Sequence, residues 1–185
     1  MTQTETIPVL DPRKFKDPEI TADGDERAHV ALTSLDTLWF NTGTLCNLEC
    51  ANCYIESSPR NDRLAYLTAR EVAVYLDEIQ TDHWVTREIG FTGGEPFMNP
   101  EIITMIEDAL GRGFEVLVLT NAMKPMMKCG EDLLRLHGIY GRKLTLRISV
   151  DHYGQRLHEE ERGPRSWTPM LEGLEWLSSH GFHIA

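Results

Sequence analysis

The sequence has no run of apolar residues long enough to cross a lipid bilayer, and its polar N-terminus lacks the basic and apolar regions of a secretory signal. These absences exclude an integral membrane protein and make the cytoplasm the expected location. The rest of the composition is that of a globular domain: of 185 residues, 41% are apolar and 25% are charged, which is enough for one hydrophobic core.

Basic residues are scarce. Eighteen Lys and Arg stand against 29 Asp and Glu, so the formal net charge is -11. A protein with this charge is not expected to attract the phosphate backbone of nucleic acid. A small molecule or a peptide therefore remains as the expected substrate class.

Cysteines are few as well, and three of the four lie within eight residues, at Cys46, Cys50 and Cys53. Such a cluster does not predict a disulfide framework, and a reducing compartment would keep the thiols available as ligands. The remaining cysteine, Cys129, is predicted to be a buried or half-buried thiol without a role in the site.

The spacing Cys-x3-Cys-x2-Cys places soft sulfur ligands on one short loop, which suits an iron-sulfur cluster or zinc. Three thiolates can hold three irons of a 4Fe-4S cluster and leave one iron open for another ligand. The alternative is a zinc site that takes its fourth ligand from His83, His137 or Cys129, although zinc sites usually show a second ligand pair in the sequence.

The chain divides into an N-terminal extension, residues 1–35, and a core domain, residues 36–185. In the core domain, apolar runs typical of strands alternate with helical patterns, which predicts an α/β fold of consecutive parallel strand and helix units. Strands are predicted at Thr37–Thr42, Arg87–Thr92, Phe114–Thr120, Lys143–Val150 and from Phe182.

Three of the intervening helices have start signals in the form of capping residues or an early proline. The predicted starts are Thr68 with the capping-box Glu71, Asn99 with Pro100, and Thr168 with Pro169. The apolar stripes predicted to face the core are Val72, Leu76 and Ile79; Ile102, Ile103, Ile106 and Leu110; and Leu171, Leu174 and Leu177. A further, shorter helix is predicted around residues 131–137.

Candidate binding groups follow the second strand, because active sites of parallel strand and helix folds lie at the carboxyl ends of the strands. Gly93 and Gly94 allow a ligand to approach the backbone closely, and the carboxylate of Glu95 can accept hydrogen bonds from an ammonium group. A glycine pair after a strand is also a common turn, so the motif alone does not decide between the two interpretations.

The third and fourth strands end in polar side chains as well. Thr120 and Asn121 can hydrogen-bond a ribose or a carboxylate, or can cap their own loop. Arg147, Ser149 and Asp151 alternate along the fourth strand, so they share one face and would point into a barrel interior. A polar ligand there would satisfy them.

The cysteine loop, followed about forty residues later by Gly-Gly-Glu-Pro, resembles the radical S-adenosylmethionine (radical SAM) enzymes. The resemblance implies a partial (β/α)6 barrel, truncated near the fifth strand, with a 4Fe-4S cluster on Cys46, Cys50 and Cys53. It also implies that SAM chelates the open iron, and that a reductant supplies the electron that cleaves SAM to methionine and a 5'-deoxyadenosyl radical. That radical would abstract a hydrogen atom from the substrate.

The resemblance carries over to individual residues. It implies that Gly93, Gly94 and Glu95 bind the methionyl amino group, and that Ser149, in a Ser-x-Asp motif with Asp151, contacts SAM. It further implies that the guanidinium of Arg162 pairs with the SAM carboxylate, a role for which Arg165 is the alternative.

One position departs from the family pattern. Family members usually carry an aromatic residue directly before the third cysteine, near the adenine, and this chain has Asn52 there. Tyr54 or backbone groups are then the expected adenine contacts. His152 and Tyr153 after the fourth strand are either a substrate-facing acid and base or a surface pair.

Related enzymes have six strand and helix units, whereas this sequence stops at the apolar opening of a fifth strand. We therefore expect a fragment with an open barrel edge, which favours self-association. The alternatives to a working enzyme core are a non-catalytic zinc or iron-sulfur module and an inactive truncated fragment. The determinants of the substrate are expected in later strands.

Overall fold

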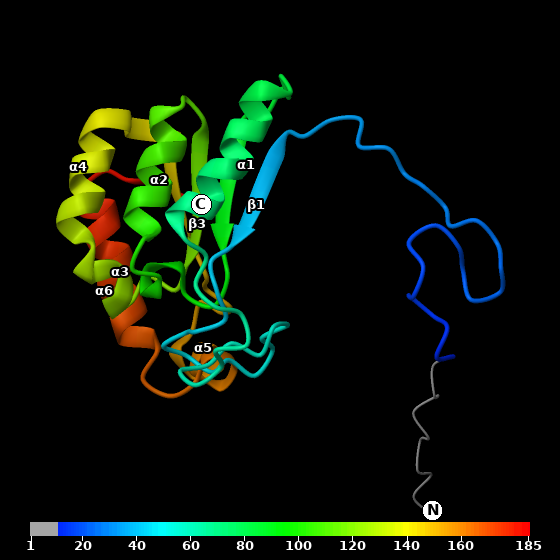
Figure 1. Ribbon diagram of the computed structural model, residues 1–185. Helices are drawn as coiled ribbons and strands as arrows, with labels where there is room; N and C mark the ends of the chain where they lie inside the picture. Colours follow the sequence, from blue (N-terminus) through cyan, green and yellow to red (C-terminus); the bar gives the residue numbers. More distant parts are fainter. Residues whose placement is uncertain (1–10) are drawn as a thin grey trace, which may run out of the picture. The chain divides into compact units, whose positions relative to one another are not determined.

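The computed structural model describes residues 11–185, which form two compact units: one ends at Thr33 and the other is Ser34–Ala185 (Figure 1). Residues 1–10 of the predicted extension lie outside the described part. In the first unit, Ile20 pairs with Glu26 in an isolated antiparallel bridge, and the Asp17 carboxylate accepts the backbone N–H groups of Glu19 and Ile20. These contacts make a short series of turns.

The second unit is built on a five-stranded parallel sheet whose spatial order follows the chain. Its strands are β1 (Thr37–Asn41), β2 (Glu88–Thr92), β3 (Glu115–Thr120), β4 (Leu144–Ile148) and β5 (His183–Ile184). The predicted α/β fold is confirmed. The fourth strand is shorter than expected because Lys143 belongs to the 3-10 turn η2 (Gly141–Lys143), and the chain leaves the ladder after Ile148.

Helices connect successive strands, and α1, α2, α4 and α6 lie on one side of the sheet (Figure 1). The helical elements are α1 (Ala69–Thr81), η1 (Pro96–Met98), α2 (Ile102–Gly111), α3 (Lys124–Lys128), α4 (Gly130–Tyr140), α5 (Gln155–Arg162) and α6 (Trp167–Ser179). Among residues 11–185, no helix combines the length and the apolar character needed to cross a membrane.

One hydrophobic core lies between the sheet and these helices. Alternate strand residues such as Phe40, Phe91, Val118 and Leu146 are buried in it. They meet the predicted helix stripes, of which Leu76 is fully buried. The period of two along the strands and of about 3.6 along the helices explains why both patterns could be found in the sequence.

The capping box at the start of α1 is confirmed. The hydroxyl of Thr68 accepts the Glu71 backbone N–H at 3.2 Å, and the Glu71 carboxylate accepts the Thr68 backbone N–H at 2.8 Å. Two backbone donors that the helix leaves without partners are thus satisfied.

The predicted start of the next helix at Asn99–Pro100 is wrong, since α2 begins at Ile102. The carboxamide of Asn99 accepts the Glu101 backbone N–H at 2.9 Å and donates to the carbonyl oxygens of Thr42 at 3.1 Å and Leu67 at 2.8 Å. The Asn99 side chain therefore links its own turn to the segments that contain Thr42 and Leu67. The helix starts after that turn.

The start predicted at Thr168 is also displaced. Helix α6 begins at Trp167 after Ser166, so Thr168 and Pro169 lie inside its first turn. Proline is tolerated there because the first N–H groups of a helix have no partner within the helix. The helix thus starts two residues earlier than predicted. Its buried residues are Met170, Gly173 and Leu177, and Leu171, which was predicted to face the core, is 38% exposed.

The buried face of α6 includes Gly173, which packs against the loop after β3. A Cβ atom at this position would lie 1.8 Å from the carbonyl oxygen of Ala122. Ala122 itself has a positive φ of 58°. The absence of a side chain at Gly173 lets α6 support the loop that carries part of the site described below.

The face of the sheet away from the core carries Trp39, Gly90, Leu117 and Thr145, which are neighbours in register. Arg147 follows on the same face two residues further along β4 and is exposed, as the predicted alternation requires. A Cβ atom at Gly90 would lie 2.3 Å from the Trp39 ring, so the indole lies directly over the glycine.

We predict that Gly173→Ala lowers the free energy of unfolding by about 2 kcal/mol or more, because its methyl group has no room against the Ala122 carbonyl. Gly138→Ala is the matched control. Gly138 lies in α4 with no atom within 4 Å of an added Cβ, so alanine there should stabilise by about 0.5–1 kcal/mol. Urea unfolding of both variants checks this, and equal effects would contradict it.

Candidate functional site

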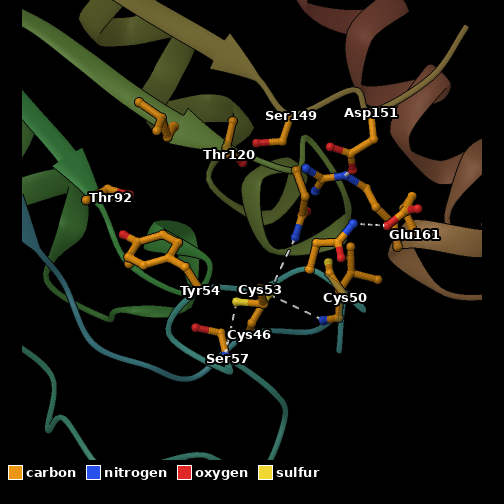
Figure 2. Close-up of a pocket in the computed structure, with 17 residues that line it drawn as sticks. Cys46, Cys50, Cys53, Tyr54, Ser57, Thr92, Thr120, Ser149, Asp151 and Glu161 are labelled. Atoms are coloured by element: carbon orange, nitrogen blue, oxygen red, sulfur yellow. Dashed lines mark hydrogen bonds and ion pairs between the residues drawn. The ribbon is translucent and has the colours of Figure 1, made fainter. Parts of the chain in front are cut away.

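A cavity of about 500 Å³ lies at the carboxyl ends of the strands, between the loops after β1 to β4 and the short helix α5 (Figure 2). The predicted site residues that line it are Cys46, Cys50, Cys53, Tyr54, Gly93, Gly94, Thr120, Asn121, Ser149, Asp151 and Arg162. Glu95 is the one predicted site residue that lies behind the cavity wall. Residues that are far apart in the sequence therefore meet at one place.

The cysteine loop follows β1 and folds back on itself. Leu45 and Ser58 form an isolated parallel bridge, and the Cys46 N–H donates to the Ser58 carbonyl at 3.1 Å. The Cys53 N–H donates to the Cys50 carbonyl at 3.2 Å. The three thiols are free, and all three cysteines line the cavity (Figure 2).

Nitrogen donors contact the sulfur atoms of Cys46 and Cys53. The Leu48 N–H lies 3.4 Å from Cys46 Sγ, and the Ser57 N–H lies 3.2 Å from Cys53 Sγ. The side-chain nitrogen of Asn121 lies 3.9 Å from Cys46 Sγ. Donors aimed at sulfur stabilise its deprotonated, metal-binding form.

The polypeptide alone nevertheless disfavours thiolates. Burial raises the pKa of Cys46 to about 12 and also raises the pKa of Cys50, which the nearby Arg162 guanidinium partly offsets. At neutral pH the Cys46 thiol is therefore protonated until a positive centre displaces the proton. The donor set thus fits a cationic metal centre whose binding releases protons.

The residues considered as a fourth zinc ligand lie elsewhere. The His137 ring stacks on Phe182 with centroids 4.5 Å apart, and neither Cys129 nor His83 lines the cavity. Within residues 11–185, no group of three or more His, Cys, Asp or Glu side chains is arranged to hold a single metal ion. None of the three candidate fourth ligands therefore lines the cavity together with the cysteine loop.

The two glycines after β2 bring this loop against the cysteine loop. A Cβ atom at Gly94 would lie 2.2 Å from the Leu45 carbonyl oxygen, and one at Gly93, whose φ is +144°, would lie 2.7 Å from the Gly43 carbonyl oxygen. The Gly94 N–H donates to the Gly43 carbonyl at 2.8 Å. The two glycines were predicted to let a ligand approach the backbone closely. In the structure they let the loop after β2 pack against the cysteine loop.

The Glu95 carboxylate is 2% exposed and is satisfied within the protein. It accepts the Thr120 hydroxyl at 2.8 Å, the Asn121 backbone N–H at 2.8 Å and the Phe97 backbone N–H at 3.2 Å. Burial raises the pKa of Glu95 to about 7, although these hydrogen bonds and the Arg162 charge lower it in part. A cation bound in the cavity near Glu95 would therefore favour its charged form.

Helix α5 closes the other side of the cavity. The Arg162 guanidinium pairs with the Asp151 carboxylate, while the Asn52 carboxamide donates to Glu161 (Figure 2). The Ala51 N–H also donates to the Glu161 carbonyl at 2.8 Å. These contacts between Glu161 and the cysteine loop were not predicted from the sequence.

Of the two arginines considered for the site, only Arg162 lines the cavity. His152 and Tyr153 do not line it: their rings stack with centroids 4.2 Å apart, and Tyr153 is 90% exposed. The surface-pair interpretation therefore describes them. Tyr54 lines the cavity and is 81% exposed.

The family model described as Radical SAM superfamily matches residues 40–185. The antilisterial bacteriocin subtilosin biosynthesis protein AlbA of Bacillus subtilis is 31% identical over 140 residues, which are 75% of this chain and 30% of AlbA. An AdoMet-dependent heme synthase of Oleidesulfovibrio alaskensis is 25% identical over 139 residues, which are 74% of this chain and 33% of that protein.

A crystal structure of Streptococcus suis SuiB bound to S-adenosylmethionine superposes with a TM-score of 0.68 at 20% identity, over 83% of this chain and 33% of SuiB. At that identity the likeness establishes the fold. This chain spans about a third of the length of these relatives.

We predict that Glu95→Gln flattens the pH dependence of stability in the metal-free protein. Because the pKa of folded Glu95 is raised, its contribution to stability is complete below the ordinary value of 4.5 and is lost as the pH rises through about 7. The drop in unfolding free energy between about pH 5 and pH 8 should shrink by on the order of 2 kcal/mol.

Urea unfolding at the two pH values measures this drop. Glu172→Gln, at an exposed position of α6, is the matched control and should leave the drop unchanged. A Glu95→Gln profile that parallels the wild-type profile would show that Glu95 does not titrate in this range.

Proposed function

Given that this chain belongs to the radical SAM superfamily, whose family model covers residues 40–185, we propose that it is the cofactor-binding part of a radical SAM enzyme. In this proposal it binds a 4Fe-4S cluster and SAM, and it cleaves SAM reductively. The observation that carries the proposal is the convergence of three free cysteine thiols on a cavity lined by the polar ends of β2 to β4 and by α5.

Cys46, Cys50 and Cys53 would hold the cluster. Soft thiolates suit iron, and the cavity of about 500 Å³ leaves room beside them for a further ligand. The raised pKa values of Cys46 and Cys50 mean that binding would release protons. When bound, the cluster supplies one electron for the cleavage of SAM.

The ligand's methionyl end would meet groups of both charges. The Arg162 guanidinium, whose side chain is only 15% exposed, is a partner for the SAM carboxylate in competition with Asp151. The backbone of Gly93 and Gly94 would receive the amino group, with Glu95 behind it. Because a nearby ammonium favours the charged form of a carboxylate, SAM binding would lower the pKa of Glu95 from about 7.

The remaining cavity residues would orient the rest of SAM. Ser149 offers a hydroxyl group for the ribose, and Tyr54 offers a ring for the adenine in place of the usual aromatic before the third cysteine. The Thr120 hydroxyl, predicted to bind the ribose, already donates to Glu95 and accepts the Ala122 N–H. In these roles the side chains bind and orient the ligand, while the cofactors carry the difficult chemistry.

We propose a peptide as the substrate class, and an electron-donating partner that reduces the cluster. Two similarities support the peptide: AlbA takes part in the biosynthesis of a bacteriocin, and SuiB has been crystallised with its precursor peptide SuiA. The similarity to a heme synthase leaves a small molecule as the second candidate. We propose a cytoplasmic location because free clustered thiols persist in a reducing compartment.

The first test is anaerobic reconstitution with iron and sulfide, followed by reduction, addition of SAM and detection of 5'-deoxyadenosine. About four irons per chain are expected, as in a 4Fe-4S cluster. Cys50→Ala should lose SAM cleavage, whereas Cys129→Ala, outside the cavity, should retain it. Bound zinc without sulfide, or normal cleavage by Cys50→Ala, would refute the proposal.

A second test concerns the carboxylate of the ligand. Arg162→Met should weaken the binding of S-adenosylhomocysteine to the reconstituted protein by about 10- to 100-fold, the loss of one charge-assisted hydrogen bond. Arg165→Met removes a guanidinium that does not line the cavity and should leave affinity within about threefold. Equilibrium dialysis measures both, and equal losses would remove Arg162 from the site.

A further inference from the structure

Asn121 was predicted either to contact the ligand or to cap its own loop. Its oxygen does cap the loop after β3 by accepting the Met123 N–H, and its nitrogen faces the cysteine loop. Its side-chain nitrogen lies 2.9 Å from Asn47 Oδ1 and 3.9 Å from Cys46 Sγ. The residue is 5% exposed. The buried carboxamide nitrogen therefore contacts the cysteine loop at two points, the Asn47 oxygen and the Cys46 sulfur.

Neighbouring groups fix the orientation of this carboxamide. Its oxygen accepts the Met123 backbone N–H at 3.1 Å, so the nitrogen must point the other way, toward Asn47 and Cys46. Asn47 is held as well, because its own nitrogen donates to Met123 Sδ at 3.6 Å. The two hydrogens of the Asn121 nitrogen therefore have two acceptors, Asn47 Oδ1 and Cys46 Sγ.

Cys46 is contacted by more donors than Cys53. The Leu48 N–H and the Asn121 carboxamide both approach Cys46, whereas the Ser57 N–H approaches Cys53. Hydrogen bonds to the sulfur ligands of an iron-sulfur cluster set its reduction potential, since they stabilise the more negative, reduced state. The asymmetry singles out Cys46 as the ligand whose surroundings favour reduction.

We propose that Asn121 is a positioning residue for the cluster: its carboxamide orients Cys46 and raises the reduction potential by donating to the Cys46 sulfur. This inference rests on the proposed function. In this role Asn121 influences the reduction of the cluster and does not contact SAM directly.

The two roles for Asn121 predict opposite outcomes. The backbone N–H of residue 121 donates to Glu95, and that contact survives substitution of the side chain. If the side chain acts on Cys46, its removal shifts the potential and leaves affinity for the ligand nearly unchanged. If it contacts SAM, affinity falls and the potential stays.

The test compares Asn121→Asp with the wild type after reconstitution. Aspartate keeps an acceptor for the Met123 N–H but loses the donor to Cys46. At a fixed potential, the ratio of reduced to oxidised cluster should fall at least about tenfold, which is about 59 mV for one electron. Redox titration followed by electron paramagnetic resonance measures it, and the affinity for S-adenosylhomocysteine should stay within about threefold.

Asn52→Asp is the matched control. It places the same carboxylate on the same cavity, but the Asn52 nitrogen donates to Glu161 and not to a cysteine. Its potential should shift less than half as far as that of Asn121→Asp. Equal shifts would show a simple effect of charge and overturn the inference.

Asn121→Ala guards against a folding defect in the aspartate variant, and should lower the potential in the same direction without adding charge. Iron and sulfide counts separate this inference from the proposed function. A wild-type protein that takes up no cluster refutes the proposed function and the inference together. A wild-type protein with about four irons, alongside an Asn121→Ala variant of unchanged potential, refutes the inference alone.

Discussion

A buried carboxylate holds the site together. Glu95 accepts hydrogen bonds from Thr120, Asn121 and Phe97 and so ties the carboxyl end of β2 to that of β3. Directly before it, Gly94 lies so close to the Leu45 carbonyl that a side chain would collide, which fixes the cysteine loop against the same corner. The placement of the sulfurs therefore depends on one short turn after β2.

Two buried acidic groups of the site, Cys46 and Glu95, stay wholly or partly uncharged until a partner binds. Burial raises the pKa of Cys46 to about 12 and that of Glu95 to about 7, so the sulfur ligand is neutral at physiological pH and the carboxylate is divided between its two forms. Folding thus escapes much of the cost of burying charges. A cationic metal centre and an ammonium group would each ionise the group beside it, so ligand affinity and proton release are coupled.

Sequence patterns predicted the features that depend on residues close together in the chain. Apolar runs located all five strands, and the cysteine spacing and the glycine pair located two walls of the cavity. The missed features depend on distant partners. Asn99 is engaged by Thr42 and Leu67 and does not cap a helix, and Asn52 meets Glu161 from 109 residues away. No local period encodes such side-chain pairs, which appear only when the loops are assembled.

The indole of Trp39 gives the sheet a built-in optical signal. The other three tryptophans, Trp84, Trp167 and Trp176, pack against the core on the helix side, whereas Trp39 lies 42% exposed over Gly90 on the opposite face. Anything that covers this face, whether a bound substrate or another stretch of polypeptide, removes water from a single indole. Its fluorescence emission would then move to shorter wavelength, so occupancy of the barrel interior can be followed in solution without a label.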